Sequence, residues 1–393
     1  MRSLEHICIF EDDGVSNFLP LTWTRPVFDL RCGAMTLAER IRKFFPEARL
    51  HLQCRDYLAD VVAQSHPYAS VNQSITEPCL FINGRTLFDQ TLFERLLSDD
   101  TLELTNGDSR LAFWNTLTPR RESCNNTLLS FPWNLVSQNV ELLKGDFDKP
   151  SQMGNLYDGV HLVNPDRISI GKDTVIKPGV VLDAENGPIS IGDHVHIMAN
   201  SVIEGPVNIG SRSLIKIGAK IYGGTTIGPS CKVGGEVEAS VLQGFSNKQH
   251  DGFLGHSFVG EWCNLGADTN TSDLKNNYST VKVTLKGEEI DTGERFVGLI
   301  MGDHSKSGIN TMFNTGTVVG VSCNIFGAGH PPKTIPSFSW VDGQTLSEYR
   351  LEKALSVAEI VMGRRKVVMS AALKRLMEHV YYTTSPDRSG FST

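Results

Sequence analysis

The chain has 393 residues, more than one hydrophobic core usually organises, so we expect at least two domains. A composition of 40% hydrophobic and 21% charged residues excludes a disordered chain, and a formal charge of −7 disfavours non-specific nucleic-acid binding, which needs a broad positive field. The eight cysteines include no CxxC pair, and no apolar stretch approaches the roughly 18 residues that span a bilayer. These features predict a cytoplasmic protein with reduced thiols, no membrane span and a small-molecule partner.

The first 150 residues alternate short apolar runs with helical stretches. HICIF, LHLQC and CLFIN have the composition of strands, and residues 36–45 and 88–97 that of helices. This alternation predicts an α/β domain, which we place at residues 1–155. Glu11 and Asp12 follow the first strand and are candidate Mg²⁺ ligands, because Mg²⁺ needs only one or two carboxylates beside phosphate and water. A solvated acidic turn is the alternative.

The middle of the chain has a six-residue repeat. Residues 151–335 hold 28 of the 36 glycines, and apolar residues recur there at steps of six. A period of six fits neither a helix nor a simple strand, but it is typical of a solenoid of short strands joined by regular turns. We therefore predict a left-handed parallel β-helix over residues 156–335. The clearest run of the repeat is Ile191, Ile197, Ile203, Ile209, Ile215, Ile221, Ile227 and Val233.

Two stretches, residues 236–252 and 273–294, interrupt this repeat. We expect both to be loops extruded from the coil, and because loops on a rigid scaffold often carry function, both are candidate sites. Harmless surface excursions are the alternative. After residue 336 the repeat ends, and helical spacing at residues 346–363 and 371–382 predicts a helical appendage over residues 336–393.

One segment carries a specific resemblance. Residues 246–277, SNKQHDGFLGHSFVGEWCNLGADTNTSDLKNN, resemble the acetyltransferase half of the bacterial bifunctional glucosamine-1-phosphate acetyltransferase/N-acetylglucosamine-1-phosphate uridyltransferase family. The family motif there runs approximately SKAxHLxYLGDxxIGxxVNIGAGT. The phrases FLPLTWTRPVFDLRCG and GLIMGDHSKSGINTMFNTGTVVG are similar to a divergent branch of that family, described as sugar nucleotidyltransferases with a hexapeptide-repeat domain. The resemblance implies that the first domain is a Rossmann-like nucleotidyltransferase domain.

The resemblance also implies an acyl-transfer site. Acetylating an amino sugar needs a base for the amine proton, and a histidine side chain suits this task near neutral pH. His250 aligns with the catalytic histidine of the family, although a lone histidine is more often structural. Backbone N–H groups of residues 264–267 would stabilise the oxyanion. The further positions implied are Lys216, Phe253 and Asn264 for the sugar phosphate, and Ala267, Asp303 and Val321 for acetyl-coenzyme A.

Some of these positions depart from the family. Phe253 replaces a tyrosine and loses a hydroxyl donor, and Lys216 replaces an arginine and loses the bidentate fork. Lys216 on an exposed coil edge without function is the alternative. The first domain lacks the glycine-rich loop LAAGxGTRM, so Arg25 and Arg31 are candidates for the positive charge that binds phosphates, or else structural salt-bridge partners.

The sequence thus predicts an enzyme of sugar-nucleotide biosynthesis. By resemblance it acetylates glucosamine 1-phosphate with acetyl-coenzyme A and then forms UDP-N-acetylglucosamine from UTP with Mg²⁺, as a homotrimer. Two alternatives remain open at this stage. One is the same chemistry on another sugar or nucleotide, such as thymidylyl transfer to glucose 1-phosphate, and the other is a sugar-nucleotide-binding regulatory protein that has lost catalysis.

Overall fold

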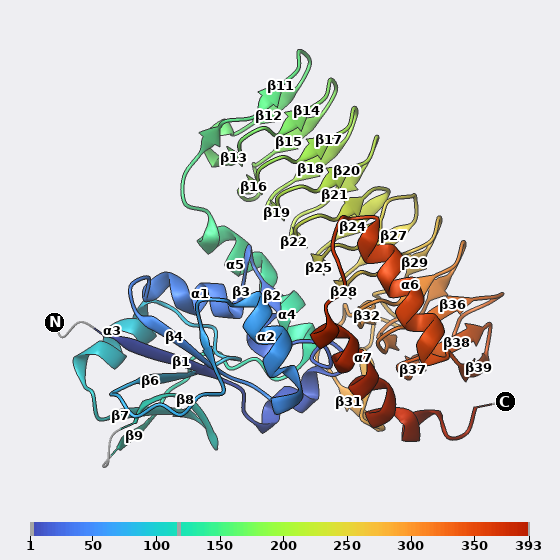
Figure 1. Ribbon diagram of the computed structural model, residues 1–393. Coiled ribbons are helices and arrows are strands. Elements are labelled where there is room, and N and C mark those ends of the chain that lie inside the picture. Colours follow the sequence, from blue (N-terminus) through green and yellow to red (C-terminus); the bar gives the residue numbers. More distant parts are fainter. Residues whose placement is uncertain (1–3, 116–118, 392–393) are drawn as a thin grey trace.

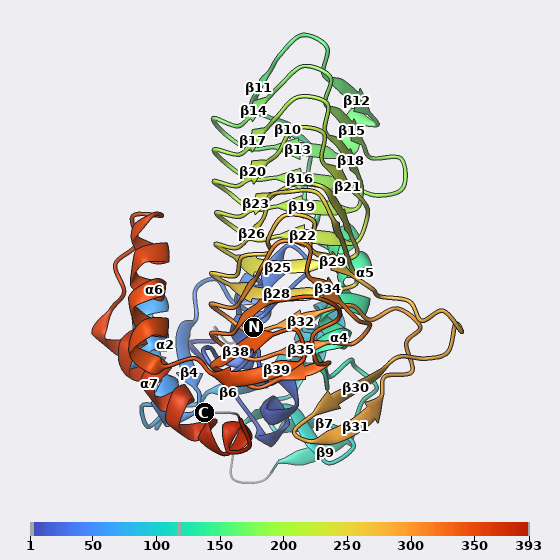
Figure 2. The ribbon, with the colours of Figure 1, turned by 90° about the vertical axis from the view of Figure 1, so that its right-hand side faces the viewer.

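The computed structural model describes residues 4–115 and 119–391. A twisted α/β sheet is followed by a long column of parallel coils and by two C-terminal helices that return to the sheet (Figures 1 and 2). All eight cysteines are free thiols. None of the helices within the described residues is long and apolar enough to cross a bilayer.

The N-terminal domain is a Rossmann-like sheet with strand order β5-β4-β1-β6-β8-β7-β9. Its central strand β1 (His6–Phe10) pairs in parallel with β4 (Arg49–Gln53) and β6 (Leu80–Asn83). Ile7, Cys8 and Ile9 are fully buried, as expected of a parallel strand covered on both faces. The other elements are β2 (Arg31–Cys32), β3 (Met35–Thr36), α1 (Leu37–Phe44), α2 (Ala59–Ser65), β5 (Ser70–Val71), α3 (Gln90–Ser98), β7 (Leu102–Asn106), β8 (Ser109–Trp114), β9 (Arg120–Ser123), α4 (Pro132–Ser137) and α5 (Asn139–Asp146).

The predicted left-handed β-helix follows. Its strands form three flat faces, and the apolar residues of the six-residue repeat fill the interior as one core. Face 1 consists of β10 (Ser151–Gln152), β13 (Ile168–Ile170), β16 (Ile189–Ile191), β19 (Val207–Ile209), β22 (Thr225–Ile227), β25 (Val241–Gly244), β28 (Phe258–Glu261), β32 (Ile300–Met301), β35 (Val318–Val319) and β37 (Thr334–Ile335).

The other two faces are also parallel, except that the last strand of face 2, β39, pairs antiparallel with β38. Face 2 consists of β11 (Asn155–Leu156), β14 (Val175–Ile176), β17 (His196–Ile197), β20 (Leu214–Ile215), β23 (Lys232–Val233), β26 (Asn247–Lys248), β33 (Lys306–Ser307), β36 (Asn324–Phe326), β38 (Ser339–Asp342) and β39 (Thr345–Glu348). Face 3 consists of β12 (His161–Val163), β15 (Val181–Asp183), β18 (Val202–Glu204), β21 (Lys220–Ile221), β24 (Glu236–Glu238), β27 (Phe253–Gly255), β29 (Asn270–Thr271) and β34 (Met312–Phe313). The strands therefore run from residue 151 to residue 348, beyond both ends of the predicted range.

The first predicted loop is not extruded. Residues 236–252 form β24, β25 and β26, which pair with the coils on either side. The repeat breaks there because a turn is shortened: the inward residues Val233 and Val237 are four positions apart rather than six, with Gly234 and Gly235 between them. Gly235 has φ +68°, a conformation that glycine adopts readily. The change of period thus marks a tighter corner in a continuous coil.

The second predicted loop is confirmed. Residues 273–294 leave the coil and form an antiparallel hairpin of β30 (Lys282–Leu285) and β31 (Glu288–Asp291). Its inner side chains Val281, Val283 and Leu285 are buried in an apolar cluster shared with residues of the N-terminal domain. The hairpin is therefore an arm of the β-helix that packs on the first domain.

The C-terminal helices α6 (Leu351–Gly363) and α7 (Ala371–Thr383) confirm the predicted helical appendage. α7 lies against α2, and both C-terminal helices contribute to the core of the N-terminal domain. Asn139 at the start of α5 is fully buried and bonds to Gly33 and to the backbone of the β-helix at Gly224. The domains are thus joined by apolar packing and by buried polar contacts.

Candidate active sites

His250 lies on an exposed turn between β26 and β27, at the corner where face 2 meets face 3. The turns of consecutive coils stack along this corner. The Asp268 N–H bonds to the Asp251 carbonyl, and the Asn310 N–H bonds to the Ala267 carbonyl. His250, Ala267 and Ile309 therefore occupy equivalent positions on three successive coils. Ile309 is 71% exposed, so the corner is open to solvent and to other molecules.

The shortened turn borders His250 on the other side. A side chain on Gly235 would place its Cβ 2.6 Å from the His250 carbonyl oxygen and 2.6 Å from the Lys248 Nζ, so only glycine fits. Gly234 in turn lies between the Lys216 side chain and the Gln249 carbonyl. Because this turn is two residues shorter than the six-residue repeat, it forms a low point in the ridge of stacked turns. Lys216 and His250 lie on the coils on either side of that low point.

Lys248 falls at or beside a lysine of the family motif, but the sequence interpretation gave it no role. It points into the coil, is only 2% exposed, and donates from Nζ to the His250 carbonyl oxygen at 2.6 Å. Burial lowers the pKa of Lys248 to about 8. Its further sequence signal was a lysine at an inward position of the repeat. By this bond Lys248 holds the turn that presents His250.

The remaining positions predicted around the acyl-transfer site are partly together. Phe253 begins β27 directly after the His250 turn, and its N–H bonds to Asn270 Oδ1. Asn264 faces outward on face 2, where its side chain accepts from Asn247 at 3.3 Å. Ala267 shares the corner with His250. The structure thus groups Lys216, His250, Phe253 and Ala267, with Asn264 on the adjoining face.

Most backbone donors of the predicted oxyanion site are already used. The N–H groups of Asn264, Leu265 and Gly266 bond within the coil, to Ser305 O, Asn247 O and Ser307 Oγ respectively. Among the residues described, the Ala267 N–H has no such bond. Of this segment, Ala267 is therefore the donor left for an oxyanion.

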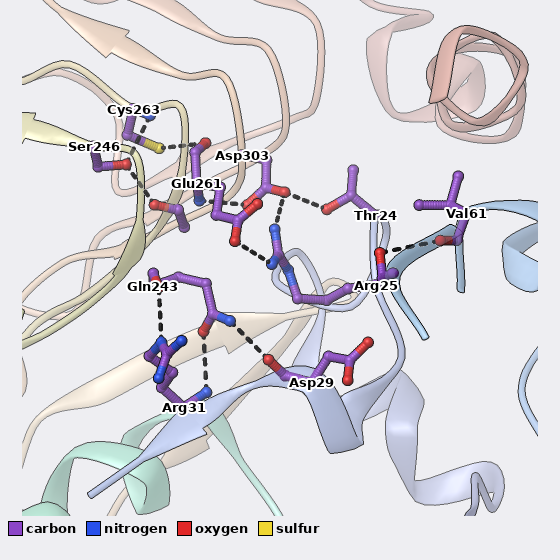
Figure 3. A network of polar contacts seen from close by, with 12 residues as sticks. Thr24, Arg25, Asp29, Arg31, Val61, Gln243, Ser246, Glu261, Cys263 and Asp303 are labelled. Carbon is purple, nitrogen blue, oxygen red and sulfur yellow. Dashed lines mark hydrogen bonds and ion pairs between the residues drawn. The ribbon is translucent and has the colours of Figure 1, made fainter. Parts of the chain in front are cut away.

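Asp303 and Val321 lie elsewhere. Both sit at the corner between face 1 and face 2, buried against the N-terminal domain (4% and 0% exposed). Asp303 forms an ion pair with Arg25 and accepts a hydrogen bond from the Thr24 hydroxyl at 2.7 Å (Figure 3). Arg25 also pairs with Glu261 at 3.2 Å. Two residues that the sequence assigned to different sites thus form one salt bridge between domains.

Arg31 is a second contact between domains. Its backbone N–H and its Nε both bond to Gln243, at 3.0 Å each, and Gln243 donates back to the Asp29 carbonyl (Figure 3). The structure therefore uses Arg25 and Arg31 in the structural role that the sequence left as the alternative. Their use in phosphate binding stays an untested prediction.

A stack of aromatic side chains follows the corner between face 1 and face 2. Phe245, Trp262 and His304 occupy equivalent turn positions, all at positive φ, with ring centroids 4.3 and 6.2 Å apart. Trp262 and His304 border a cavity of about 430 Å³ between the three parts of the molecule. Burial lowers the pKa of His304 to about 4, and its Nδ1 has no partner among the described residues.

A larger cavity, of about 570 Å³, opens in the N-terminal domain beyond the carboxyl ends of β1 and β6. Ligands of open α/β sheets bind at such strand ends. Arg85 crosses its floor and holds Asp12 through two bonds of 2.7 and 2.6 Å. Although burial alone raises it, the bonds from Arg85 and Asn83 lower the pKa of Asp12. The lining residues are Phe10, Asp12, Asp13, Gly14, Asn17, Arg85, Asn106, Asp108, Ser109, Arg110, Leu128 and Ser130.

Glu11 and Asp12 do not form a shared metal site in this structure. The Glu11 carboxylate accepts from the Val27 N–H at 2.8 Å and pairs with Arg55 at 3.0 Å, whereas Asp12 faces Arg85. Within the described ranges no group of three or more His, Cys, Asp or Glu side chains is placed to hold a metal ion. The two carboxylates thus face separate arginines.

Comparison with known proteins finds one matching family model and several relatives. Residues 7–152 match the family model described as sugar nucleotidyl transferase. The chain is 38% identical over 88 residues to the bifunctional protein GlmU of Methanocaldococcus jannaschii, covering 22% of this chain and 21% of that protein. It is 29% identical over 195 residues to a bifunctional sugar-1-phosphate nucleotidylyltransferase/acetyltransferase of Sulfurisphaera tokodaii, covering 50% of this chain and 43% of that protein. The chain is related to these bifunctional transferases.

The aligned parts span less than half the length of these relatives. Among solved structures, a UDP-N-acetylglucosamine acyltransferase matches 60% of this chain and 90% of its own, with 12% identity and a TM-score of 0.36. Arg85, Asp108 and Arg110, which border the larger cavity, were not identified from the sequence. For Arg85 the signal was the Asn83-Gly84-Arg85 sequence at the end of the predicted strand CLFIN.

Proposed function

We propose that the chain is a two-domain enzyme of sugar-nucleotide biosynthesis. Its β-helix would transfer the acetyl group of acetyl-coenzyme A to the amine of glucosamine 1-phosphate, and its N-terminal domain would transfer a uridylyl group from UTP to the acetylated product. The observation that carries the acyl half is His250, exposed beside a shortened turn on the corner of the coil. The names of the relatives and the matched family model support the pairing of both activities.

In the acyl-transfer step, the neutral amine attacks the thioester carbonyl, the C–S bond breaks, and coenzyme A leaves as a thiol. His250 takes the proton that the amine loses and passes it to the departing thiolate, a role worth about 10²–10⁴-fold in rate. The Ala267 N–H is the available donor for the transient oxyanion. Lys216, across the low point from His250, would attract the sugar phosphate. A second and third copy of the chain would complete the site at this corner, as expected for a homotrimer.

In the nucleotidyl-transfer step, a phosphate oxygen of the sugar phosphate attacks the α-phosphorus of UTP and pyrophosphate leaves. The cavity at the ends of β1 and β6 would hold both reactants, and its volume of about 570 Å³ is in the usual range for ligand sites. Arg85 and Arg110 border this cavity and are the arginines closest to a substrate bound there.

The test uses the purified full chain with glucosamine 1-phosphate, acetyl-coenzyme A, UTP and Mg²⁺, and follows free thiol and pyrophosphate separately. We expect both products from the wild type and no thiol release from His250→Ala. His161→Ala, which changes another exposed histidine of the β-helix, is the matched control and should keep both activities.

Three results would revise the proposal. Thiol release that persists in His250→Ala would refute the role of His250. Products only with another amino sugar or with dTTP would change the substrate, a possibility kept open by Phe253 and Lys216. If nucleotide binds without turnover and no thiol appears with any sugar, the chain is a binding protein.

A further inference from the structure

The hairpin arm of the β-helix contacts the loop that lines the cavity of the N-terminal domain. Its turn consists of Lys286 at φ +51° and Gly287 at φ +82°, the geometry of a tight two-residue hairpin turn. Lys286 Nζ donates to Ser16 Oγ at 3.1 Å and to Asn17 Oδ1 at 3.0 Å. Asn17 lines the cavity of the N-terminal domain. An ammonium group from the second domain is therefore hydrogen-bonded to a side chain that lines the first domain's cavity.

The arm is fixed in this position. Val283 and Leu285 on its inner face are buried, and they share an apolar cluster with Val15 and Phe18 of the same cavity loop. This loop, which includes the short helix at Asp13–Phe18, occupies the place after β1 where the sequence lacks a glycine-rich phosphate loop. The side chains next to Lys286 thus hold it against the segment that lines the cavity.

The arginines that line the cavity already have carboxylate partners. Arg85 pairs with Asp12 at 2.6 Å, and Arg110 pairs at 3.1 Å with Glu103, which also pairs with Arg121 at 2.9 Å. Lys286 differs, because its partners are neutral oxygens and none of the described carboxylates lies within ion-pair distance of it. An ammonium group has three N–H donors, and only two are used here. The third is available to an anion.

We propose that Lys286 binds a phosphate group of the substrate in the N-terminal cavity, so that the nucleotidyltransferase site is completed by a residue of the β-helix. This inference rests on the proposed nucleotidyl transfer. A triphosphate carries charge that the cavity's paired arginines balance poorly, and a lysine is an effective point charge for phosphate. The hairpin supplies this charge in place of the missing loop.

The test compares Lys286→Met, Lys286→Gln and Lys286→Arg with the wild type by calorimetric titration of UTP and of tripolyphosphate, in the full chain with Mg²⁺. Loss of one charged hydrogen bond is expected to weaken UTP and tripolyphosphate binding about tenfold in the Met and Gln variants, and the Arg variant should bind as the wild type does. The difference should shrink at high salt. The Gln variant keeps a donor for Asn17 without the charge, so it separates phosphate binding from loop positioning.

Lys282→Met is the matched control. Lys282 lies on the same hairpin, is exposed, and pairs with Glu289 at 2.8 Å. The Lys282→Met variant should bind UTP as the wild type does. Thiol release should stay unchanged in every variant, and this result would show that the β-helix is intact.

Unchanged UTP binding in Lys286→Met or in Lys286→Gln would overturn the role of Lys286 alone. Loss of both UTP binding and thiol release would assign Lys286 a structural role and also overturn the proposal. A wild type that binds neither UTP, dTTP nor tripolyphosphate would refute the proposed nucleotidyl transfer itself, a result distinguishable from the other two.

Discussion

His304 should make the folded protein sensitive to mild acid. The side chain is 3% exposed, and burial lowers its pKa to about 4, whereas a histidine in the unfolded chain titrates near 6.5. Below pH 6.5 the unfolded chain binds a proton at this histidine, whereas the folded chain binds it only when the pH falls to about 4. The contribution of neutral His304 to the free energy of unfolding is therefore fully present above pH 6.5 and decreases as the pH falls below that value. At pH 5, which is about 1.5 units below 6.5, the loss is about 2 kcal/mol.

The substitution His304→Phe removes the titration and keeps the ring. His304 has φ +61°, yet Phe245 and Trp262 occupy the equivalent turns of other coils at φ +54° and +60°, so an aromatic side chain is tolerated there. The buried Nδ1 that lacks a partner also disappears. We therefore expect a variant that folds and keeps its stack on Trp262.

The assay is urea unfolding followed by tryptophan fluorescence at pH 7.5 and pH 5. Between these values the wild type should lose about 2 kcal/mol more than His304→Phe. His194→Phe is the control, because His194 also sits at positive φ on this corner but is exposed, and this variant should follow the wild type. Parallel losses in the wild type and in His304→Phe would refute the assignment of the acid sensitivity to His304.

Substitutions at three other places, with their controls, test further features of the structure. Arg25→Met leaves the Asp303 carboxylate buried without its cation and should destabilise the protein by about 3–5 kcal/mol, and the double variant Arg25→Met/Asp303→Leu should recover part of that loss in the same unfolding assay. The folded chain releases the Lys248 proton near pH 8, whereas the unfolded chain keeps it until about pH 10.4. The free energy of unfolding of the wild type should therefore rise by up to about 3 kcal/mol over this range, and Lys248→Met should abolish the rise. Gly235→Ala should lower thiol release by crowding the His250 carbonyl, whereas Gly287→Ala, which is also at positive φ but has open space around it, should not.

The β-helix could be predicted from the sequence because its signal is local. Each inward isoleucine is followed at once by its turn, so a six-residue period reports both the interior and the corners. The same period misled at residues 236–252. A turn shortened at Gly234 and Gly235 and a loop extruded from the coil both break the repeat, and only pairing with the coils on either side distinguishes them. The loop after residue 273 was recognisable because the repeat stays broken for a long stretch, but the hairpin that it forms was not predicted.

The candidate sites were predictable only where a motif is contiguous. His250 and Ala267 lie within one resembling segment, and the structure stacks them on successive coils. Arg25 and Asp303 are 278 positions apart, and no local pattern links them. Each therefore invited a functional interpretation of its own, and the salt bridge between them became evident only from the packing of the domains. The sequence showed that Lys286 lies in a polar segment of the second predicted loop. It gave no sign that Ser16 and Asn17 are the partners of Lys286.

The segment from Asp13 to Arg31 connects these observations. It lines the N-terminal cavity through Asn17, receives the hairpin through Phe18, and docks on the β-helix corner through Arg25. A glycine-rich loop that wraps phosphate needs little support from side chains, because backbone N–H groups do the binding. This segment instead has buried side chains that need the β-helix as a partner. The lining of the first domain's cavity and the docking of the second domain therefore depend on one stretch of chain, which is the arrangement that the proposed role of Lys286 requires.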